Sequence, residues 1–407
     1  MNMQPNPPAS TDVLIVGAGP SGLALANTLA KAGVSFVVLD KLAKGQNTSR
    51  AAVVHAHTLE VLEEIGVSQR LVEQGIRIDK FAIRDRDRCL VQLRFGALPS
   101  RHPYLLMLPQ DRTEATLAEA LEGSGHAVQR GWAVDAVEDL GEHVRVSATS
   151  VTGEQRTYLA RYVVGADGMH SIVRKTAGIG FSGSSYEDSF VLADVEMDWS
   201  HGSDEVKLYF SPQGLVVVAP LAEGVFRIVA TLEDAPEHPG LADVQALLDM
   251  RGPSTGFTRV SKVLWSSRFR LQHRVADAYR QGRLFLAGDA AHVHSPAGGQ
   301  GMNTGLVDAC VLGRILAEVI SGRREESFLD EYQSMRRPAA VKVLKLAGRL
   351  TTMATLKHAP QRAMRNLLLS TVNCLPKMKR KFEMGLSGLD RREAAQLSAA
   401  STSTQPA

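Results

Sequence analysis

The sequence predicts an α/β fold in which a parallel sheet carries a β-rich insertion and a helical segment follows. Three observations lead to this prediction. Apolar runs at 13–16 and 36–39 flank a glycine-rich turn and a helical stretch. Further short apolar runs at 162–164 and 284–286 each end in a small-residue turn that carries an aspartate. A block rich in strand-forming residues spans 190–231.

Length and composition limit the protein class. At 407 residues the chain exceeds one ordinary core, so we expect two interwoven domains and a C-terminal appendage. Apolar residues make up 44% and charged residues 22%, as in ordinary globular proteins. The first ten residues do not have the pattern of a secretory signal, and no apolar stretch is long enough for a transmembrane span. The three cysteines have neither disulfide nor metal-site spacing, so we expect no metal and a reducing cytoplasm.

The strand pattern predicts two further antiparallel units. Residues 132–160 alternate between apolar and polar and are interrupted by Gly141 and Gly153, which predicts a small meander. The block at 190–231 has turn signals at 211–214 and 222–224, so we expect it to form a separate sheet.

The C-terminal part is predicted to be helical. From Asn303, apolar residues recur at helical spacing as far as Gly322, which is placed to stop the helix. The region after Arg336 is helix-rich and is interrupted near Pro360 and Pro376. The last residues, 391–407, are mostly Ser, Thr, Ala and Gln, and we expect a disordered tail.

The first glycine-rich turn fits GxGxxG through Gly17, Gly19 and Gly22. The first glycine permits a tight turn, the second lets backbone approach a pyrophosphate, and the third lets helix and strand pack closely. Asp40 ends the second strand, where a carboxylate accepts hydrogen bonds from an adenosine ribose. This context predicts a dinucleotide site rather than an empty turn. The predicted site also includes the flanking residues Pro20, Ser21 and Lys41.

Two later turns carry the other acidic residues of interest. Asp167 lies in GADG at 165–168, and Asp289 lies in AGDAAH at 287–292. Taken alone, either aspartate is more simply a helix N-cap. Their occurrence together with the first motif favours one shared site.

The three motifs resemble the FAD fingerprints of the aromatic-hydroxylase class (class A) of flavoprotein monooxygenases, typified by para-hydroxybenzoate hydroxylase. The matching strings are VLIVGAGPSGLALA, VVGADGMHSIVR and RLFLAGDAAHVHSPAGGQGMNTGLVDA, in this order over about residues 12–316. The resemblance implies a glutathione-reductase-type Rossmann FAD domain with an inserted β-sheet substrate domain and a C-terminal helical segment. It also implies the short form of the family, without a thioredoxin-like domain.

The resemblance also implies roles for single residues. Asp289 would bind the ribityl or pyrophosphate part of FAD, and Asp167 would serve both FAD and nicotinamide binding. Pro296 and Gly298 would position flavin and substrate, with no catalytic acid or base assigned. The other implied FAD contacts are Arg50, Gln110, Val134, Gly299, Gly301, Met302 and Asn303.

The residue types at 296–303 suit a cover for the flavin ring. Pro296 gives a stiff entry, and Gly298, Gly299 and Gly301 let backbone amides approach closely. A helix that starts at Asn303 would point its positive end at the ring, where negative charge accumulates on reduction. An ordinary structural turn uses the same residues.

The reaction that the resemblance implies is hydroxylation of a phenolic or heteroaromatic small molecule with FAD, NAD(P)H and O2, through a flavin hydroperoxide. Only one dinucleotide fingerprint is present, so we expect NADH or NADPH to bind transiently in a surface groove. The choice between the two, the substrate and the oligomeric state stay open.

Other enzymes of the superfamily remain alternatives. A halogenase is disfavoured because Trp132, Trp199 and Trp265 stand alone and form no WxWxIP motif. A reductase that does not use O2, or a membrane-associated quinone-pathway hydroxylase, is compatible with the same FAD motifs.

The substrate side is less specific. Strand residues that are candidates to line it alternate between two faces, and the pattern does not fix which face is inward. These candidates are Tyr209, Val216, Val218, Pro220 and Arg227, and for each of them an ordinary packing role is the better interpretation. His292 and His294 flank the third motif, where a proton-transfer role competes with ordinary hydrogen bonding.

The C-terminal segment is strongly basic. Between Tyr332 and Phe382 there are twelve Lys and Arg and no acidic residue. Since the whole chain has a net charge of +3, the rest of the chain has a net charge of −9. The simpler interpretation is a helical cap on the acidic FAD domain. The alternative is peripheral contact with anionic lipid. Nucleic acid is not expected, because aromatic residues are almost absent there.

The predicted domain limits follow from these motifs. The FAD-binding domain comprises 1–80, 101–185 and 270–335, and the substrate domain comprises 81–100 and 186–269. The C-terminal helical region is 336–390.

Overall fold

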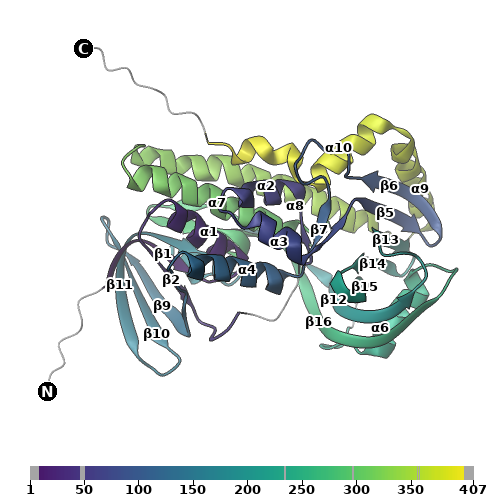
Figure 1. Ribbon diagram of the computed structural model, residues 1–407, viewed down its shortest axis with the longest axis horizontal. Coiled ribbons are helices and arrows are strands. Elements are labelled where there is room, and N and C mark those ends of the chain that lie inside the picture. The colour runs from purple at the N-terminus through teal and green to yellow at the C-terminus, as the bar shows by residue number, and fades with distance from the viewer. Residues whose placement is uncertain are drawn as a thin grey trace, which may run out of the picture.

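The computed structural model describes residues 9–45, 51–232, 235–295, 298–354, 356 and 358–397, without the side chains of 185–188, 270 and 271. Figure 1 shows the parallel sheet at one end, a curved antiparallel sheet at the other, and the C-terminal helices along one long side. Two predicted site residues, Arg50 and Pro296, lie outside the described residues.

The first sheet has the strand order β17-β18-β11-β1-β2-β8. Its central pairs are parallel, and the runs predicted at 162–164 and 284–286 lie in it as neighbours, which confirms the α/β fold class. The strands are β1 (Ala9–Val16), β2 (Phe36–Asp40), β8 (Gln129–Arg130), β11 (Gln155–Gly165), β17 (Arg280–Gln281) and β18 (Leu284–Leu286). The four residues that end β1 are buried, as expected for a strand covered on both faces.

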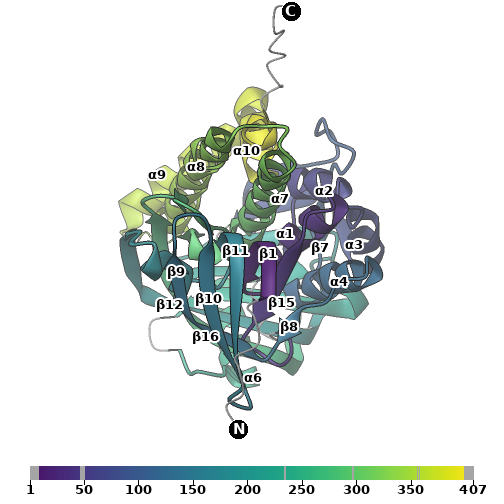
Figure 2. The ribbon, with the colours of Figure 1, turned by 90° about the vertical axis from the view of Figure 1, so that its left-hand side faces the viewer.

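The predicted meander is confirmed but is not a separate unit. Strands β9 (Trp132–Asp139) and β10 (Val144–Ser150) pair antiparallel, and β10 pairs with the first half of β11. Because β11 then continues into the parallel sheet, the meander is an extension of that sheet (Figure 2).

Helices α1 (Pro20–Lys31), α4 (Gln110–Gly123) and α7 (Gln300–Ile320) pack together over the parallel sheet. Gly313 permits the close approach of α7 to α1, since a Cβ there would lie 2.7 Å from Thr28 Cγ2. A short helix, α5 (Ile172–Thr176), follows the second motif, and its N-cap Ser171 accepts a hydrogen bond from the Arg174 amide.

The second sheet is larger than the block predicted at 190–231. Its order is β19-β16-β12-β15-β14-β13-β5-β6. Its strands are β5 (Lys80–Asp85), β6 (Arg88–Arg94), β12 (Phe181–Trp199), β13 (Glu205–Ser211), β14 (Gly214–Pro220), β15 (Val225–Leu232), β16 (Thr258–Ala276) and β19 (His292–Val293). The polar composition of β16 concealed it from pattern analysis, because a strand with one face towards solvent need not be apolar.

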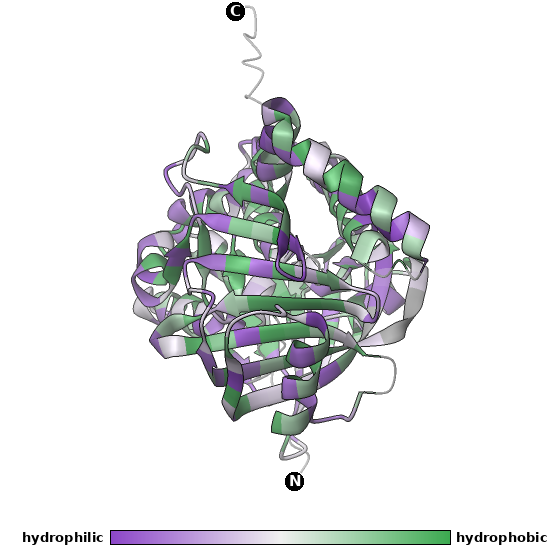
Figure 3. Cartoon of the chain, turned by 90° about the vertical axis from the view of Figure 1, so that its right-hand side faces the viewer, coloured by the Kyte–Doolittle hydropathy of each residue, from purple (hydrophilic) through white to green (hydrophobic). Residues whose placement is uncertain are grey.

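The two faces of the second sheet have different neighbours, and one of them is covered by α6. Tyr209, Val216 and Val218 pack in one cluster with α6 (Leu241–Arg251), and Pro220 pairs across the strands with Phe226 of that cluster. These four side chains therefore point away from the FAD domain and have the ordinary packing role that the sequence favours for each of them. Figure 3 shows α6 in front of this sheet.

Arg227 belongs to the opposite face. It pairs across the strands with Asp194 and Ala219, one position out of phase with the α6-facing residues. A short sheet with the order β3-β7-β4 lies on this side, and two small helices pack beside it. These elements are β3 (Val53–Val54), β4 (Ile76–Ile78), β7 (Leu105–Met107), α2 (Ala56–Glu63) and α3 (Ser68–Gln74).

The C-terminal region is helical, as predicted. It comprises α8 (Asp330–Ala354), α9 (Ala359–Cys374) and α10 (Pro376–Leu386), followed by the 3-10 helix η4 (Leu389–Ala395). Pro360 and Pro376 lie in the first turns of α9 and α10, where a missing N–H costs no hydrogen bond. Among the described residues, no helix is both long enough and apolar enough to cross a membrane.

The prediction of a disordered tail from residue 391 was wrong for its first part. Arg392 donates to Glu60 of α2 at 2.8 Å, and Ala395 is buried. These tertiary contacts order a segment whose composition alone favours disorder. Residues 398–407 lie outside the described residues.

Candidate functional site

The three motifs meet at the carboxyl ends of adjacent parallel strands. The Ala166 amide donates to Val16 O at 2.8 Å, and the Ala287 amide donates to Gly165 O at 2.9 Å. These bonds place the turn after β11 between the turns after β1 and β18. The structure thus brings together Gly17, Asp167 and Gly288, at the sheet edge where α/β folds bind ligands.

Glycine is required in the first motif for steric reasons. Gly17 has φ +101°, and a Cβ there would lie 2.4 Å from Ala166 O. A Cβ at Gly22 would lie 2.0 Å from Gly17 O. At Gly19, in contrast, no described atom beyond its chain neighbours lies within 4 Å of the Cβ position. Gly17 and Gly22 therefore serve internal packing, while Gly19 borders open space.

The first and third motifs touch through Ser21. A Cβ at Gly288 would lie 2.4 Å from Ser21 Oγ, and a Cβ at Gly305 would lie 2.5 Å from it. Pro20 starts α1, and Gly288 starts the short 3-10 helix η2 (Gly288–Ala290). The starts of α1, η2 and α7 therefore lie together.

The acidic residues of the three motifs differ in their surroundings. Asp40 holds its own turn, because its carboxylate accepts from the Ala18 amide at 2.7 Å and the Leu42 amide at 2.8 Å. Asp167 Oδ2 accepts from the Ile172 amide at 2.7 Å, while its Oδ1 is buried with no hydrogen-bond partner among the described residues. Burial raises the pKa of Asp167. Asp289 is exposed between buried Gly288 and Ala290.

The helix after the third motif begins earlier than predicted. Its first residue is Gln300 rather than Asn303, and Gly299 caps it with φ 62°. The left-handed conformation of Gly299 turns the chain directly into the helix. The amides of Gln300, Gly301, Met302 and Asn303 therefore form the first turn and have no acceptor within the helix.

The side chain of Asn303 anchors this helix start. Its Oδ1 accepts from the His55 amide at 2.8 Å, and its Nδ2 donates to Val53 O at 2.9 Å and Gly299 O at 2.8 Å. Val53 is so close that a Cβ at Gly299 would lie 2.2 Å from its Cγ1. The helix start is thereby joined to β3.

The remaining predicted residues lie around this centre. Gln110, at the start of α4, accepts from the Ala51 amide at 3.3 Å and donates to Glu114 at 2.8 Å. Lys41 is exposed beyond β2, and Val134 lies half-buried on β9 opposite Ala148. Gln110 thus adjoins the segment that carries Arg50, whereas Val134 lies on the meander.

Sequence reasoning did not assign Arg227 to the domain junction. Its guanidinium donates to both Asp194 oxygens at 2.7 Å and to Ala51 O at 2.8 Å. The side chain is 2% exposed. It joins the second sheet to the chain just after residue 50, a contact that no local pattern in the sequence indicates.

The two histidines after the third motif have different environments. His292 Nε2 lies 2.8 Å from Asp308 Oδ2, and the other oxygen of Asp308 accepts from Arg336 Nε at 2.6 Å. Burial alone would raise the pKa of Asp308, but Arg336 and His292 outweigh it and lower that pKa. These three buried groups are bonded to one another, which supports the local role for His292.

His294 is a poor candidate for a base. Burial, together with neighbouring His292, lowers its pKa to about 4. A general base works best with a pKa near the working pH. We therefore expect His294→Asn to leave the pH profile of kcat unchanged between pH 6 and pH 9. A displaced pH limb in steady-state kinetics would contradict this and restore the proton-transfer role.

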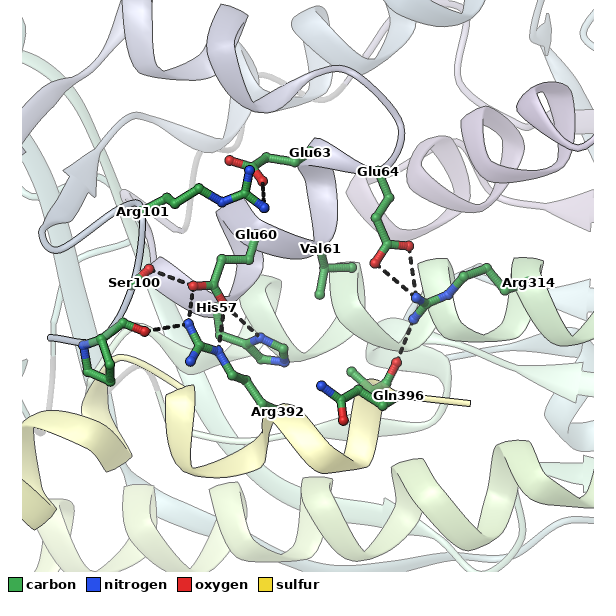
Figure 4. Close-up of a pocket in the computed structure, with 12 residues that line it drawn as sticks. His57, Glu60, Val61, Glu63, Glu64, Ser100, Arg101, Arg314, Arg392 and Gln396 are labelled. Carbon is green, nitrogen blue, oxygen red and sulfur yellow. Dashed lines mark hydrogen bonds and ion pairs between the residues drawn. The ribbon is translucent and has the colours of Figure 1, made fainter. Parts of the chain in front are cut away.

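A broad cleft lies away from these motifs, between α2, α7 and η4 (Figure 4). Its charged groups face one another as pairs: Glu60 with Arg392, Glu63 with Arg101, and Glu64 with Arg314. Burial would raise the pKa of Glu60, but His57 and Arg392 lower it to about 2. Since these charges neutralise each other, we interpret the cleft as a junction of the C-terminal segment with the FAD domain.

Comparison with known proteins agrees with this geometry. The family model for an FAD binding domain matches residues 10–347. Pentachlorophenol 4-monooxygenase from Sphingobium chlorophenolicum is 33% identical over 346 residues, 84% of this chain and 64% of that relative. This chain belongs to the class A flavoprotein monooxygenases. It spans less than two thirds of the length of this relative.

Two further members of the class show the extent of the likeness. The p-nitrophenol 4-monooxygenase of Pseudomonas putida has a TM-score of 0.85 at 25% identity, covering 94% of this chain and 98% of that one. An uncharacterised aromatic-compound monooxygenase of Bacillus subtilis is 37% identical over 395 residues, 94% of this chain and 76% of its own length. The likeness to these proteins therefore covers both sheets.

Proposed function

We propose that this protein is an FAD-dependent monooxygenase that hydroxylates a phenolic or heteroaromatic small molecule with NAD(P)H and O2. The observation that carries the proposal is the convergence of three FAD motifs at one sheet edge in a member of this class. When bound, FAD would take electrons from NAD(P)H and activate O2 for transfer of one oxygen atom to the ring.

The residues at the site fit FAD. The turn at the start of α1 suits a pyrophosphate, because Gly17 and Gly22 have no room for a Cβ and Gly19 borders open space. The buried Asp167 Oδ1 and the exposed Asp289 supply acceptors for hydroxyl groups. The first-turn amides of α7 suit the pyrimidine side of the ring. Asp40, Lys41, Gln110, Val134, Arg50 and Pro296 complete the proposed set of contacts.

The substrate is proposed to lie between the Gly298 loop and the inner face of the second sheet, in a substrate domain of residues 81–100 and 186–269. Phe190 and Phe269 on this face have ring centroids 5.8 Å apart. Phe190 shares an apolar cluster with Leu386, which lies 3.2 Å from the Cβ position of Gly298. An apolar wall with aromatic rings suits a planar ring substrate and excludes water.

The proposal is tested with the purified protein, FAD, NADH or NADPH and a panel of phenols under ¹⁸O₂. We expect the substrate to stimulate oxidation of either NADH or NADPH, and the product to contain one ¹⁸O atom. Oxidation that is independent of O2 would instead support a reductase. Products that lack ¹⁸O would exclude hydroxylation by this route.

A second proposal concerns the basic C-terminal helices. Met364, Leu367 and Leu368, at helical spacing on α9, are 58%, 62% and 59% exposed. Leu375 and Met378 continue the exposed apolar side chains into α10, near exposed Lys377 and Lys381. A patch of one charge sign would repel its own copy, whereas it complements an anionic lipid surface. We propose peripheral contact with such a membrane in the cytoplasm, where the free thiols would stay reduced.

Vesicle flotation tests this contact. We expect binding to phosphatidylcholine vesicles that contain phosphatidylglycerol at low salt, and release at high salt. Leu367→Ser with Leu368→Ser should weaken binding by about a hundredfold or more, since each buried leucine contributes about 2 kcal/mol and about 1.4 kcal/mol corresponds to a factor of ten. Val151→Ser, at an apolar residue 77% exposed outside the basic segment, is the matched control. Absence of anionic vesicle binding by the unmodified protein would refute the proposal.

A further inference from the structure

The carbonyl of Gly298 is held by two side chains from different parts of the chain. His55 Nε2 lies 3.0 Å from Gly298 O, and Gln300 Nε2 lies 3.1 Å from it. A hydrogen bond from His55 to this carbonyl places the imidazole hydrogen on Nε2, because a carbonyl only accepts. Gln300 Nε2 also lies 3.2 Å from His55 Nε2. Gly298 and Gly299 both have positive φ, so this loop has the backbone freedom that such tethers remove.

The Gln300 side chain extends this tether to the C-terminal region. Its Nε2 also donates to Leu386 O, at the end of α10, at 2.8 Å. Its Oε1 accepts from Arg391 Nη2, on η4, at 2.9 Å. Gln300 is 1% exposed, so these bonds are shielded from water.

The C-terminal region also contacts the chain just before the loop. Thr351 of α8 donates to Ser295 Oγ at 2.8 Å. The Cβ position of Gly298 lies 3.2 Å from Leu386 Cδ1 and 3.6 Å from Leu350 Cδ1. Helices α8 and α10 therefore back the loop on one side while the first turn of α7 leaves it on the other.

We propose that Gln300, His55 and Arg391 form a latch by which the C-terminal helices position the Gly298–Gly299 loop against the flavin. This rests on the proposed FAD site. The three are positioning residues: they hold the backbone that faces the ring and do not react. The C-terminal region is thus a part of the cofactor site rather than an appendage to it.

The test compares Gln300→Met and Arg391→Gln with Arg392→Gln. Gln300→Met keeps length and volume but removes the donor to Gly298 O and the acceptor for Arg391. Arg392 is the matched control, because it neighbours Arg391 on η4 but bonds Glu60 and Pro99 O instead of Gln300, and Arg392→Gln keeps an amide donor towards the Glu60 contact that orders η4. Arg391→Lys, which keeps a donor towards Gln300, is the conservative variant.

For Gln300→Met and Arg391→Gln we expect an altered visible spectrum of bound flavin and an FAD dissociation constant raised about tenfold, the usual effect of a lost buried hydrogen bond. The fraction of NAD(P)H oxidation that yields product should also fall. Arg392→Gln and Arg391→Lys should stay close to the unmodified protein in all three measurements. Equal changes in the Arg391→Gln and Arg392→Gln proteins, or unchanged flavin spectra in both latch variants, would overturn the proposal.

Hydrogen exchange of the apoprotein separates this proposal from the proposed function. Faster exchange of the amides at 298–303 in Arg391→Gln, but not in Arg392→Gln, would support the latch even if no hydroxylation were found. Exchange unchanged in Arg391→Gln would overturn it. If Gln300→Met fails to fold, Arg391→Gln and Arg391→Lys still decide the outcome.

Discussion

Replacing Gly19 with alanine is expected to weaken FAD binding below detection while leaving the thermal stability of the apoprotein unchanged. The backbone at Gly19 has φ −73°, which alanine adopts without strain, and the apoprotein has room for the methyl group. A pyrophosphate at the start of α1 would occupy that same space. FAD titration by fluorescence and thermal unfolding of the apoprotein measure the two effects.

Gly22→Ala is the matched control with the opposite pattern. Its methyl group would meet Gly17 O at 2.0 Å, a backbone atom that cannot move without opening the contact of α1 with β1. The apoprotein itself should lose about 3 kcal/mol or more, as overpacking of a tight interior does. If Gly19→Ala bound FAD as tightly as the unmodified protein, the proposed path of the pyrophosphate would be wrong.

Acidification is expected to destabilise the protein well before its carboxylates are protonated. Burial lowers the pKa of His55 from 6.5 to about 4, and burial with neighbouring His292 does the same for His294. Between these values the unfolded chain binds protons that the folded chain does not, so folding weakens as the pH falls. The contribution of these two histidines to the free energy of unfolding is complete above pH 6.5 and is lost as the pH falls to about 4. Each residue contributes on the order of 3 kcal/mol.

Chemical unfolding at pH 7.5, 6 and 5 measures this loss. The combined variant His55→Gln and His294→Asn should show a markedly shallower dependence on pH. The lowered pKa values of His57, His201 and His273, all with burial as the largest cause, leave it a remaining slope of the same sign. Parallel curves for the variant and the unmodified protein would show that other groups control acid unfolding.

The spacing of the first motif could be recognised in the sequence because it depends on short-range geometry. Gly17, Gly19 and Gly22 have spacings that follow from one strand, one turn and one helix start. The helix prolines Pro360 and Pro376 were informative for the same reason, since proline constrains its own φ. The start of α7 was misplaced by three residues, because Gly299 and Gly301 read as loop residues until the left-handed φ of Gly299 is known.

The sequence by itself determined the α/β class, the three strand-end motifs and the class A resemblance, because each of these follows from short contiguous stretches of the chain. Only the tertiary structure decided that Tyr209 faces α6 while Arg227 faces Ala51, because alternation along a strand does not say which face is covered. Only it brought His55, Gln300 and Arg391 together, and ordered the chain at Arg392 through Glu60. Such contacts join residues far apart in the chain, and their partners are chosen by the packing of whole elements rather than by any local pattern.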